Sequence, residues 1–198
     1  MLETGFNQIT KPEMAPPSLT TEMVRQKSYN ISLLKAGEIG DFLALQAKVW
    51  NALPVYKKHH IKLRTTEDLQ DHIAAGMPVI AIRENDGKLV AQGILGSLSQ
   101  KNVIRNIQGY PVREDDSLTT VVQSLGVDPD RQGHGLSHIF LATAKYLAQF
   151  SGHKHLLAKV ADDNLGSRAS FMKNDFYAAS SGKDPILKHQ VTYLRCDI

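Results

Sequence analysis

The sequence has little of what several specialised classes of protein require. Its 198 residues include one cysteine, Cys196, so no disulfide can form within the chain, which fits a reducing compartment. No apolar run approaches the roughly 18 residues that span a membrane. The first residues carry acids and prolines where a secretory signal needs a basic and then an apolar stretch. We therefore expect a cytoplasmic protein with no membrane partner.

The chain also lacks a strong excess of charge of either sign. It has 23 lysines and arginines against 20 acids, which gives a formal net charge of +3 at pH 7. A nucleic-acid binder usually shows a clustered basic face, whereas the local run here, Lys57 to His60, is typical of a solvated face. We expect no nucleic-acid partner. The alternative, binding through residues 57–64 and 101–105, predicts an affinity that falls steeply with salt.

The composition and the order of the chain predict one domain behind a short arm. Residues 1–28 hold Pro12, Pro16 and Pro17 and show no sustained periodicity, so we expect a flexible N-terminal arm. Residues 29–198 have the apolar content of a single globular domain.

Hydrophobic periodicity and turn residues predict the elements of this domain. Asn85-Asp86-Gly87 is a strong turn signal, which makes residues 77–84 and 88–98 an antiparallel hairpin. The other predicted elements are a strand at 29–37, helices at 38–53 and 65–76, a loop at 99–116, a strand at 117–127, a helix at 135–152, a strand at 155–160, a helix at 164–176 and strands at 176–180 and 189–198.

The stretch "VDPDRQGHGLSHIF", residues 127–140, joins a predicted strand to a predicted helix. Strand, helix and strand in this order require a parallel crossover, so the loop lies at the carboxyl end of a strand, where α/β sheets bind ligands. A helix N-terminus offers unpaired N–H groups to an anion such as phosphate, and Gly133 and Gly135 allow close approach. The alternative is a tight turn that uses glycine for geometry alone.

Spacing excludes two other phosphate-binding loops. A dinucleotide fingerprint requires a third glycine at position 138, where His138 stands. A P-loop requires Gly-Lys five positions after its first glycine, and neither Gly126 nor Gly133 is followed in this way.

The loop "VDPDRQGHGLS" resembles motif A of the GNAT superfamily, the acetyl-CoA-dependent N-acetyltransferases. That motif runs Val-x-Pro and then Gln/Arg-x-x-Gly-x-Gly/Ala at the start of a helix. Val127, Pro129, Gln132 and Gly135 match it, and the small Ser137 takes the last position.

A second signature of the same family follows in order. Its members have an asparagine after the next strand and then a helix that ends in Tyr-x-Lys-x-Gly-Phe. In "NLGSRASFMKNDF" these positions are Asn164, Phe171 for tyrosine, Lys173, Asp175 for glycine, and Phe176. With the hairpin, the resemblance covers residues 30–198.

The resemblance implies an α/β (α+β) fold: a mixed, mostly antiparallel sheet, a parallel pair splayed around the cofactor, and helices on both faces. Acetyl-CoA would be the cosubstrate, with its pyrophosphate on the backbone of the loop and its thioester oxygen near the backbone N–H of Leu125, which would stabilise the oxyanion. The implied cofactor-binding residues are Leu125, Gly126, Val127, Arg131, Gln132, Gly133, His134, Gly135, Leu136, Ser137, Asn164, Ser167, Phe171 and Lys173.

The sequence departs from the family where acid–base chemistry is usual. The strand positions that often carry a glutamate base hold Val121 and Gln123, and Gln123 can orient a water but cannot take a proton. Phe171 has no proton to give in place of the usual tyrosine acid. Glu114 and Asp116, just before this strand, are candidate bases; the alternative for each is a solvated acidic turn.

Trp50, Tyr56, His59 and His60 would shape the acceptor cleft, and this lining favours a small-molecule or peptide amine with an anionic or polar part. The sequence leaves the identity of the amine and the choice between monomer and homodimer open. No metal is expected. Two functions follow: an N-acetyltransferase that acts through a ternary complex, or a CoA-binding module that has lost catalysis and serves as a regulator or partner.

Overall fold

A computed structural model describes residues 28–98, 116–184 and 188–198, with Asp116 described for its backbone only. The predicted arm, residues 1–28, and the predicted loop, residues 99–116, lie almost entirely outside these ranges. Among the described residues, no helix has both the length and the apolar character needed to cross a membrane.

A seven-stranded sheet organises the domain, in the order β1-β2-β3-β4-β5-β7-β6. Its strands are β1 (Asn30–Leu33), β2 (Val79–Arg83), β3 (Leu89–Ser97), β4 (Thr119–Val127), β5 (His155–Ala161), β6 (Tyr177–Lys183) and β7 (Gln190–Asp197). Neighbouring strands are antiparallel except β4 and β5, which are parallel. The predicted mostly antiparallel sheet with one parallel pair is therefore confirmed.

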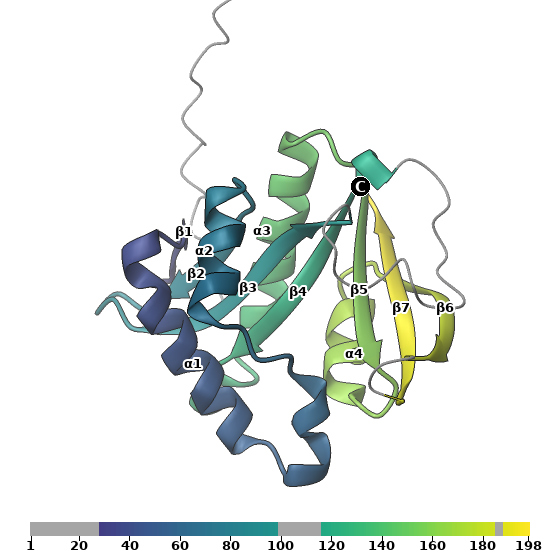
Figure 1. Cartoon of the computed structure of the whole chain (residues 1–198), viewed down its shortest axis with the longest axis horizontal. Coiled ribbons are helices and arrows are strands. Elements are labelled where there is room, and N and C mark those ends of the chain that lie inside the picture. The colour runs from purple at the N-terminus through teal and green to yellow at the C-terminus, as the bar shows by residue number, and fades with distance from the viewer. Residues whose placement is uncertain (1–27, 99–115, 185–187) are drawn as a thin grey trace, which may run out of the picture.

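Helices cover both faces of this sheet, as Figure 1 shows. They are α1 (Ile39–Ala52), α2 (Thr66–Ala74), α3 (Leu136–Phe150) and α4 (Leu165–Met172), with shorter 3₁₀ segments η1 (Ala36–Glu38), η2 (Val55–His60), η3 (Asp116–Leu118) and η4 (Pro129–Arg131). Strand side chains alternate between faces: in β2, Val79 and Ala81 pack with α1 and α2, whereas Ile80 and Ile82 pack with α3. Burial on both faces explains why this strand is apolar throughout.

The turns that the sequence marked have local causes. Thr65 caps α2 by accepting a hydrogen bond from the backbone N–H of Asp68 at 3.2 Å. The hairpin turn closes at Gly87, whose φ of +87° suits glycine. The elements not anticipated are the 3₁₀ segments, of which η2 bears on function, and β6 extends past its predicted end at residue 180 to Lys183.

The parallel pair separates after a short stretch of pairing. Residues Thr119–Val122 of β4 pair with His155–Ala158 of β5, and beyond them the strands diverge (Figure 1). On the other side of β4, Gln92 faces Gly126 and Ile94 faces Gln123, so Gly93 opposes both Ser124 and Leu125. This bulge, with Ser124 at a φ of +53°, bends β4. A side chain at Gly93 would meet the Phe140 ring, which explains glycine there.

Candidate functional site

The diverging strands open onto a cleft of about 1300 Å³. It is lined by the second half of β4, the loop before α3, the end of β5, the start of α4 and the segment between α1 and α2. Among the residues predicted to bind a ligand, the following line it: His59, His60, Gln123, Leu125, Gly126, Val127, Arg131, Gln132, Gly133, Gly135, Leu136, Ser137, Asn164, Ser167, Phe171 and Lys173.

The glycine loop presents bare backbone donors to this cleft. Gly133 and Gly135 both have a φ of +77°, and Gly135 is the N-cap of α3, so no capping side chain covers the helix end. Among the described residues, the backbone N–H groups of residues 132–137 have no hydrogen-bond partner within the protein. Consecutive free donors at a helix N-terminus form a site for an anionic group.

A buried carboxylate holds the strand end that leads into the loop. Asp128, 1% exposed, pairs with Lys48 of α1 at 2.6 Å and with Lys88 at 3.5 Å, and it accepts a hydrogen bond from the backbone N–H of Asp130. Burial opposes its ionisation, but the hydrogen bonds from Lys48 and Asp130 outweigh this and lower the pKa of Asp128. The carboxylate thereby ties α1 to the end of β4.

The start of α4 forms the wall opposite the loop. Asn164 is the N-cap of α4, and its side-chain oxygen accepts a hydrogen bond from the backbone N–H of Ser167 at 3.2 Å. Its side-chain NH₂ is not used in this cap. Phe171 is 3% exposed and meets Phe176 edge to face, with ring centroids 4.9 Å apart. Phe171 therefore contributes packing at the cleft wall.

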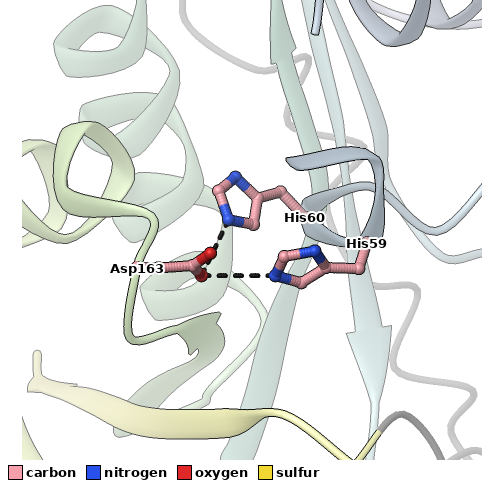
Figure 2. Close-up of side chains that lie close together, drawn as sticks. All are labelled: His59, His60 and Asp163. Carbon is pink, nitrogen blue, oxygen red and sulfur yellow. Dashed lines mark hydrogen bonds and ion pairs between the residues drawn. The ribbon is translucent and has the colours of Figure 1, made fainter. Parts of the chain in front are cut away.

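Two histidines converge on one carboxylate at the mouth of the cleft. Figure 2 shows His59 and His60, at the end of η2, pointing Nε2 atoms at Asp163, with distances to Oδ1 of 3.2 and 2.8 Å. The His60 side chain is 5% exposed, and the His59 ring stacks on His189. Because a carboxylate only accepts, each Nε2 donates and each neutral ring keeps a basic Nδ1.

The charge of Asp163 is stabilised by these contacts. Desolvation opposes its ionisation, but hydrogen bonds from His60 and His59 lower its pKa overall, so it is a carboxylate at neutral pH. The donor atoms of His59, His60 and Asp163 lie within 4.8 Å of one another, which makes them the described residues that could hold a metal ion. The sequence analysis did not predict that these three residues meet.

An arginine lies at the bulge of β4. Arg64, from the segment before α2, donates through Nε to Ser124 Oγ at 3.0 Å and through Nη2 to the side-chain oxygen of Gln123. Gln123, predicted as a residue that could orient a water, is therefore held by Arg64. Burial lowers the pKa of the Arg64 guanidinium, partly offset by the charge of Asp68.

Some predicted residues do not contribute to this lining. Among the described residues, Trp50, Tyr56 and His134 are not part of the cleft wall. Trp50 instead lies under the ammonium of Lys58, which is 3.2 Å from its ring centroid. Glu114 lies outside the described residues, as does the side chain of Asp116.

Sequence reasoning missed Arg64, Asp163 and Ser124. A signal was available for Asp163, because it directly precedes Asn164 of the second signature and so lies in the turn between β5 and α4. None was available for Arg64, since its place depends on two hydrogen bonds from its backbone to the side chain of Gln46 in α1.

Comparisons with known proteins agree with this geometry. The model of the acetyltransferase (GNAT) family matches residues 44–176. No curated protein sequence is similar enough to count as a match. Similar solved structures include the yncA protein of Salmonella typhimurium with its cofactor acetyl-CoA. That protein is 16% identical to this chain with a TM-score of 0.63, and the match covers 85% of this chain and 93% of that one.

Two further structures are of the same kind. An N-acetyltransferase from Staphylococcus aureus Mu50 is 18% identical with a TM-score of 0.62, over 86% of this chain and 98% of that one. A ribosomal-protein-alanine N-acetyltransferase from Brucella melitensis is 18% identical with a TM-score of 0.63, over 85% and 99%. At these identities the likeness shows the fold.

Proposed function

We infer, from the fact that this chain belongs to the acetyltransferase (GNAT) family, that it transfers an acetyl group from acetyl-CoA to a primary amine within a ternary complex. Acetyl-CoA is the cosubstrate and supplies an activated thioester. The observation that carries the proposal is the run of unpaired N–H groups at residues 132–137, at one end of a cleft that opens between β4 and β5.

The residues present fit the cosubstrate. The free amides of the loop would hold its pyrophosphate, and the positive end of the α3 dipole adds to that attraction. Beyond Val122, β4 has no partner strand on its β5 side, so backbone groups as far as Val127 would be available to the pantetheine arm. The side-chain NH₂ of Asn164, which its cap of α4 does not use, would donate to the arm from the other side. The backbone N–H of Leu125, at the bulge, would stabilise the oxyanion.

Acyl transfer to an amine requires a proton acceptor. The ammonium must lose a proton before its nitrogen attacks the acetyl carbon. The C–S bond then breaks, and the nitrogen gives up a second proton as the amide forms, so that coenzyme A leaves as the thiolate or, with that proton, as the thiol. We propose that His60, oriented by Asp163, accepts that proton directly or through a water. Its ring lines the cleft, its Nε2 donates to Asp163, and its Nδ1 is the basic atom.

A specific observation favours a second function. Gln123 accepts a hydrogen bond from Arg64 and cannot take a proton, and Phe171 has no proton to donate. Neither residue can therefore serve as the base or the acid that the family usually carries at these positions. A CoA-binding module that has lost catalysis would have this site. The free amides would still bind coenzyme A, and the protein would act as a regulator or partner.

A turnover experiment separates the two. Purified protein is incubated with acetyl-CoA and a panel of primary amines, small molecules and peptides, and free thiol is measured continuously. Amine-dependent thiol release with an acetylated product supports the enzyme. Acetyl-CoA binding by calorimetry, without thiol release above the rate of the amine-free sample, supports the module.

A further inference from the structure

The cleft contains a buried cation, Arg64, for which the described residues offer no ion pair. Arg64 is 6% exposed and lines the cleft wall. Its partners there, Ser124 and Gln123, are neutral. Among residues 28–98, 116–184 and 188–198, no carboxylate forms an ion pair with it, and its Nη1 has no hydrogen-bond partner. Since a buried charge is costly unless it is paired, a negative group on a ligand would complement the part of this site that the structure describes.

The arginine is built into its place. The Gln46 side chain clamps its backbone from both sides: Gln46 Nε2 donates to the Arg64 carbonyl at 3.1 Å, and the Arg64 N–H donates to Gln46 Oε1 at 2.8 Å. Both residues are buried. The clamp and the two bonds to β4 fix the guanidinium at the bulge, so little side-chain entropy remains to be lost when an anion binds.

Burial lowers the pKa of Arg64 and the charge of Asp68 partly offsets this, but among the described residues no carboxylate is close enough to form an ion pair with Arg64. The cationic side chains that line the cleft are Lys57, Lys62, Arg64, Arg131, Lys159 and Lys173, and its carboxylates are Asp163 and Asp184. Asp184 pairs with Lys159 at 2.7 Å and Asp163 accepts from the histidines. Desolvation lowers the pKa of Lys62, and the nearby positive charge of Arg64 lowers it further.

We propose that Arg64 binds a carboxylate of the acceptor, so that the acceptor class is amines that also carry a carboxylate, such as amino acids. The inference rests on the proposed function, because it assigns the thioester to the bulge of β4 and leaves Arg64 to the second substrate. The phosphates of acetyl-CoA have their own donors in the loop at residues 132–137. A planar guanidinium suits a carboxylate, which it can hold by two parallel hydrogen bonds.

The test uses pairs of acceptors that differ by one carboxylate. Amino acids are compared with their α-amides, aspartate and glutamate with asparagine and glutamine, and short peptides with their C-terminally amidated forms. Wild-type kcat/KM should favour the carboxylate member of at least one kind of pair by about 10- to 100-fold. The kind of pair that responds distinguishes a free amino acid from a peptide.

Substitutions locate that preference. Arg64→Gln should reduce it to within about threefold, mainly through the acceptor KM, while the Kd of acetyl-CoA changes by less than about threefold. Arg64→Lys keeps the charge but loses the planar pair of guanidinium donors, so it should retain part of the preference for the carboxylate. Lys62→Gln removes a neighbouring positive charge without touching Ser124 or Gln123, and it should retain most of it. Thermal unfolding of each variant verifies that the fold persists.

Two results would overturn the assignment: equal kcat/KM within every pair, or a preference that survives Arg64→Gln, whether or not that variant also loses acetyl-CoA affinity. If no amine releases thiol, the proposed function fails, and binding still decides the role of Arg64. Calorimetry on CoA-saturated protein would then compare N-acetylglycine with N-acetylglycinamide. Tighter binding of the acid, lost in Arg64→Gln, supports the assignment; equal binding overturns it.

Discussion

Single side chains in this cleft have roles that depend on their contacts and that the residue type alone does not reveal. In the sequence His60 is one residue of a basic run, whereas in the structure its Nε2 lies 2.8 Å from Oδ1 of Asp163. A histidine whose Nε2 is held by a carboxylate is fixed in one tautomer and orientation, which is how a proton acceptor is prepared. His59 shares that carboxylate at 3.2 Å and stacks on His189, so it supports the arrangement of His60.

We predict that His60→Gln lowers kcat by about 10²- to 10³-fold, because the amide cannot accept a proton. The Kd of acetyl-CoA should not change. Steady-state kinetics measure the change in kcat, and calorimetry measures the Kd of acetyl-CoA.

His155→Gln is the matched control, because His155 also bonds a carboxylate, Asp197 at 2.7 Å, but is not part of the cleft wall. Its turnover should equal that of the wild type. Enzyme treated with a chelator should keep its rate. A rate lost on chelation and restored by Zn²⁺ would make the cluster a metal site and contradict the assignment of His60.

At the scale of elements, the N-terminus of α3 is defined by a left-handed glycine, Gly135. Asp is among the residues that tolerate this conformation, so Gly135→Asp should fold while placing a carboxylate and added bulk where we propose that the pyrophosphate binds. We predict an increase of at least 100-fold in the Kd of acetyl-CoA, measured by calorimetry. Gly152→Asp is the control, since Gly152 also has a positive φ, +79°, at the other end of α3. If Gly135→Asp binds acetyl-CoA as tightly as Gly152→Asp does, the loop is a simple turn and not a phosphate site.

The link between α1 and the end of β4 predicts a pH-dependent stability. Asp128→Asn removes the charge that pairs with Lys48 and Lys88, and it should cost about 1–3 kcal/mol at pH 7. Because the folded pKa of Asp128 is lowered, its contribution is complete above the unfolded value of about 4 and is lost as pH falls through the folded value.

Urea unfolding at several pH values tests this link. The difference between wild type and Asp128→Asn should be constant from pH 7 to about 5 and should shrink below about 4. Lys35→Gln serves as the control, because it removes the charge of an exposed lysine for which the described residues offer no ion pair. A difference that grows on acidification would contradict the assigned sign.

The elements themselves were accessible to sequence reasoning, because each depends on a local pattern. Helical spacing is visible at Leu136, Ile139 and Phe140, and the residues Asn85-Asp86-Gly87 are typical of a hairpin turn. The bulge of β4 was not accessible. It arises from the register between Gly93 and the pair Ser124 and Leu125, which no single segment encodes. The meeting of His60 with Asp163 likewise spans distant parts of the chain.

At the scale of the whole molecule, the sheet consists of two parts joined along a short seam. One part runs from β1 to β4 and the other contains β5, β7 and β6, and their pairing extends only over Thr119–Val122 and His155–Ala158. The cleft lies where this pairing stops. A cosubstrate bound in the cleft as we propose would contact both parts, through the loop before α3 on one side and Asn164 on the other.

Filling this gap should therefore stabilise the fold as a unit. With free acetyl-CoA at 100 times its Kd, linkage gives about 2.7 kcal/mol, which corresponds to a rise in Tm of roughly 5–10 °C for a domain of this size. Hydrogen exchange should slow most at the ends of β4 and β5, because backbone groups that lack a partner strand are covered there. Thermal scanning and exchange mass spectrometry measure both, with Gly135→Asp as the variant that should not respond. A rise in Tm without protection of these strand ends would mean that the ligand binds outside the cleft.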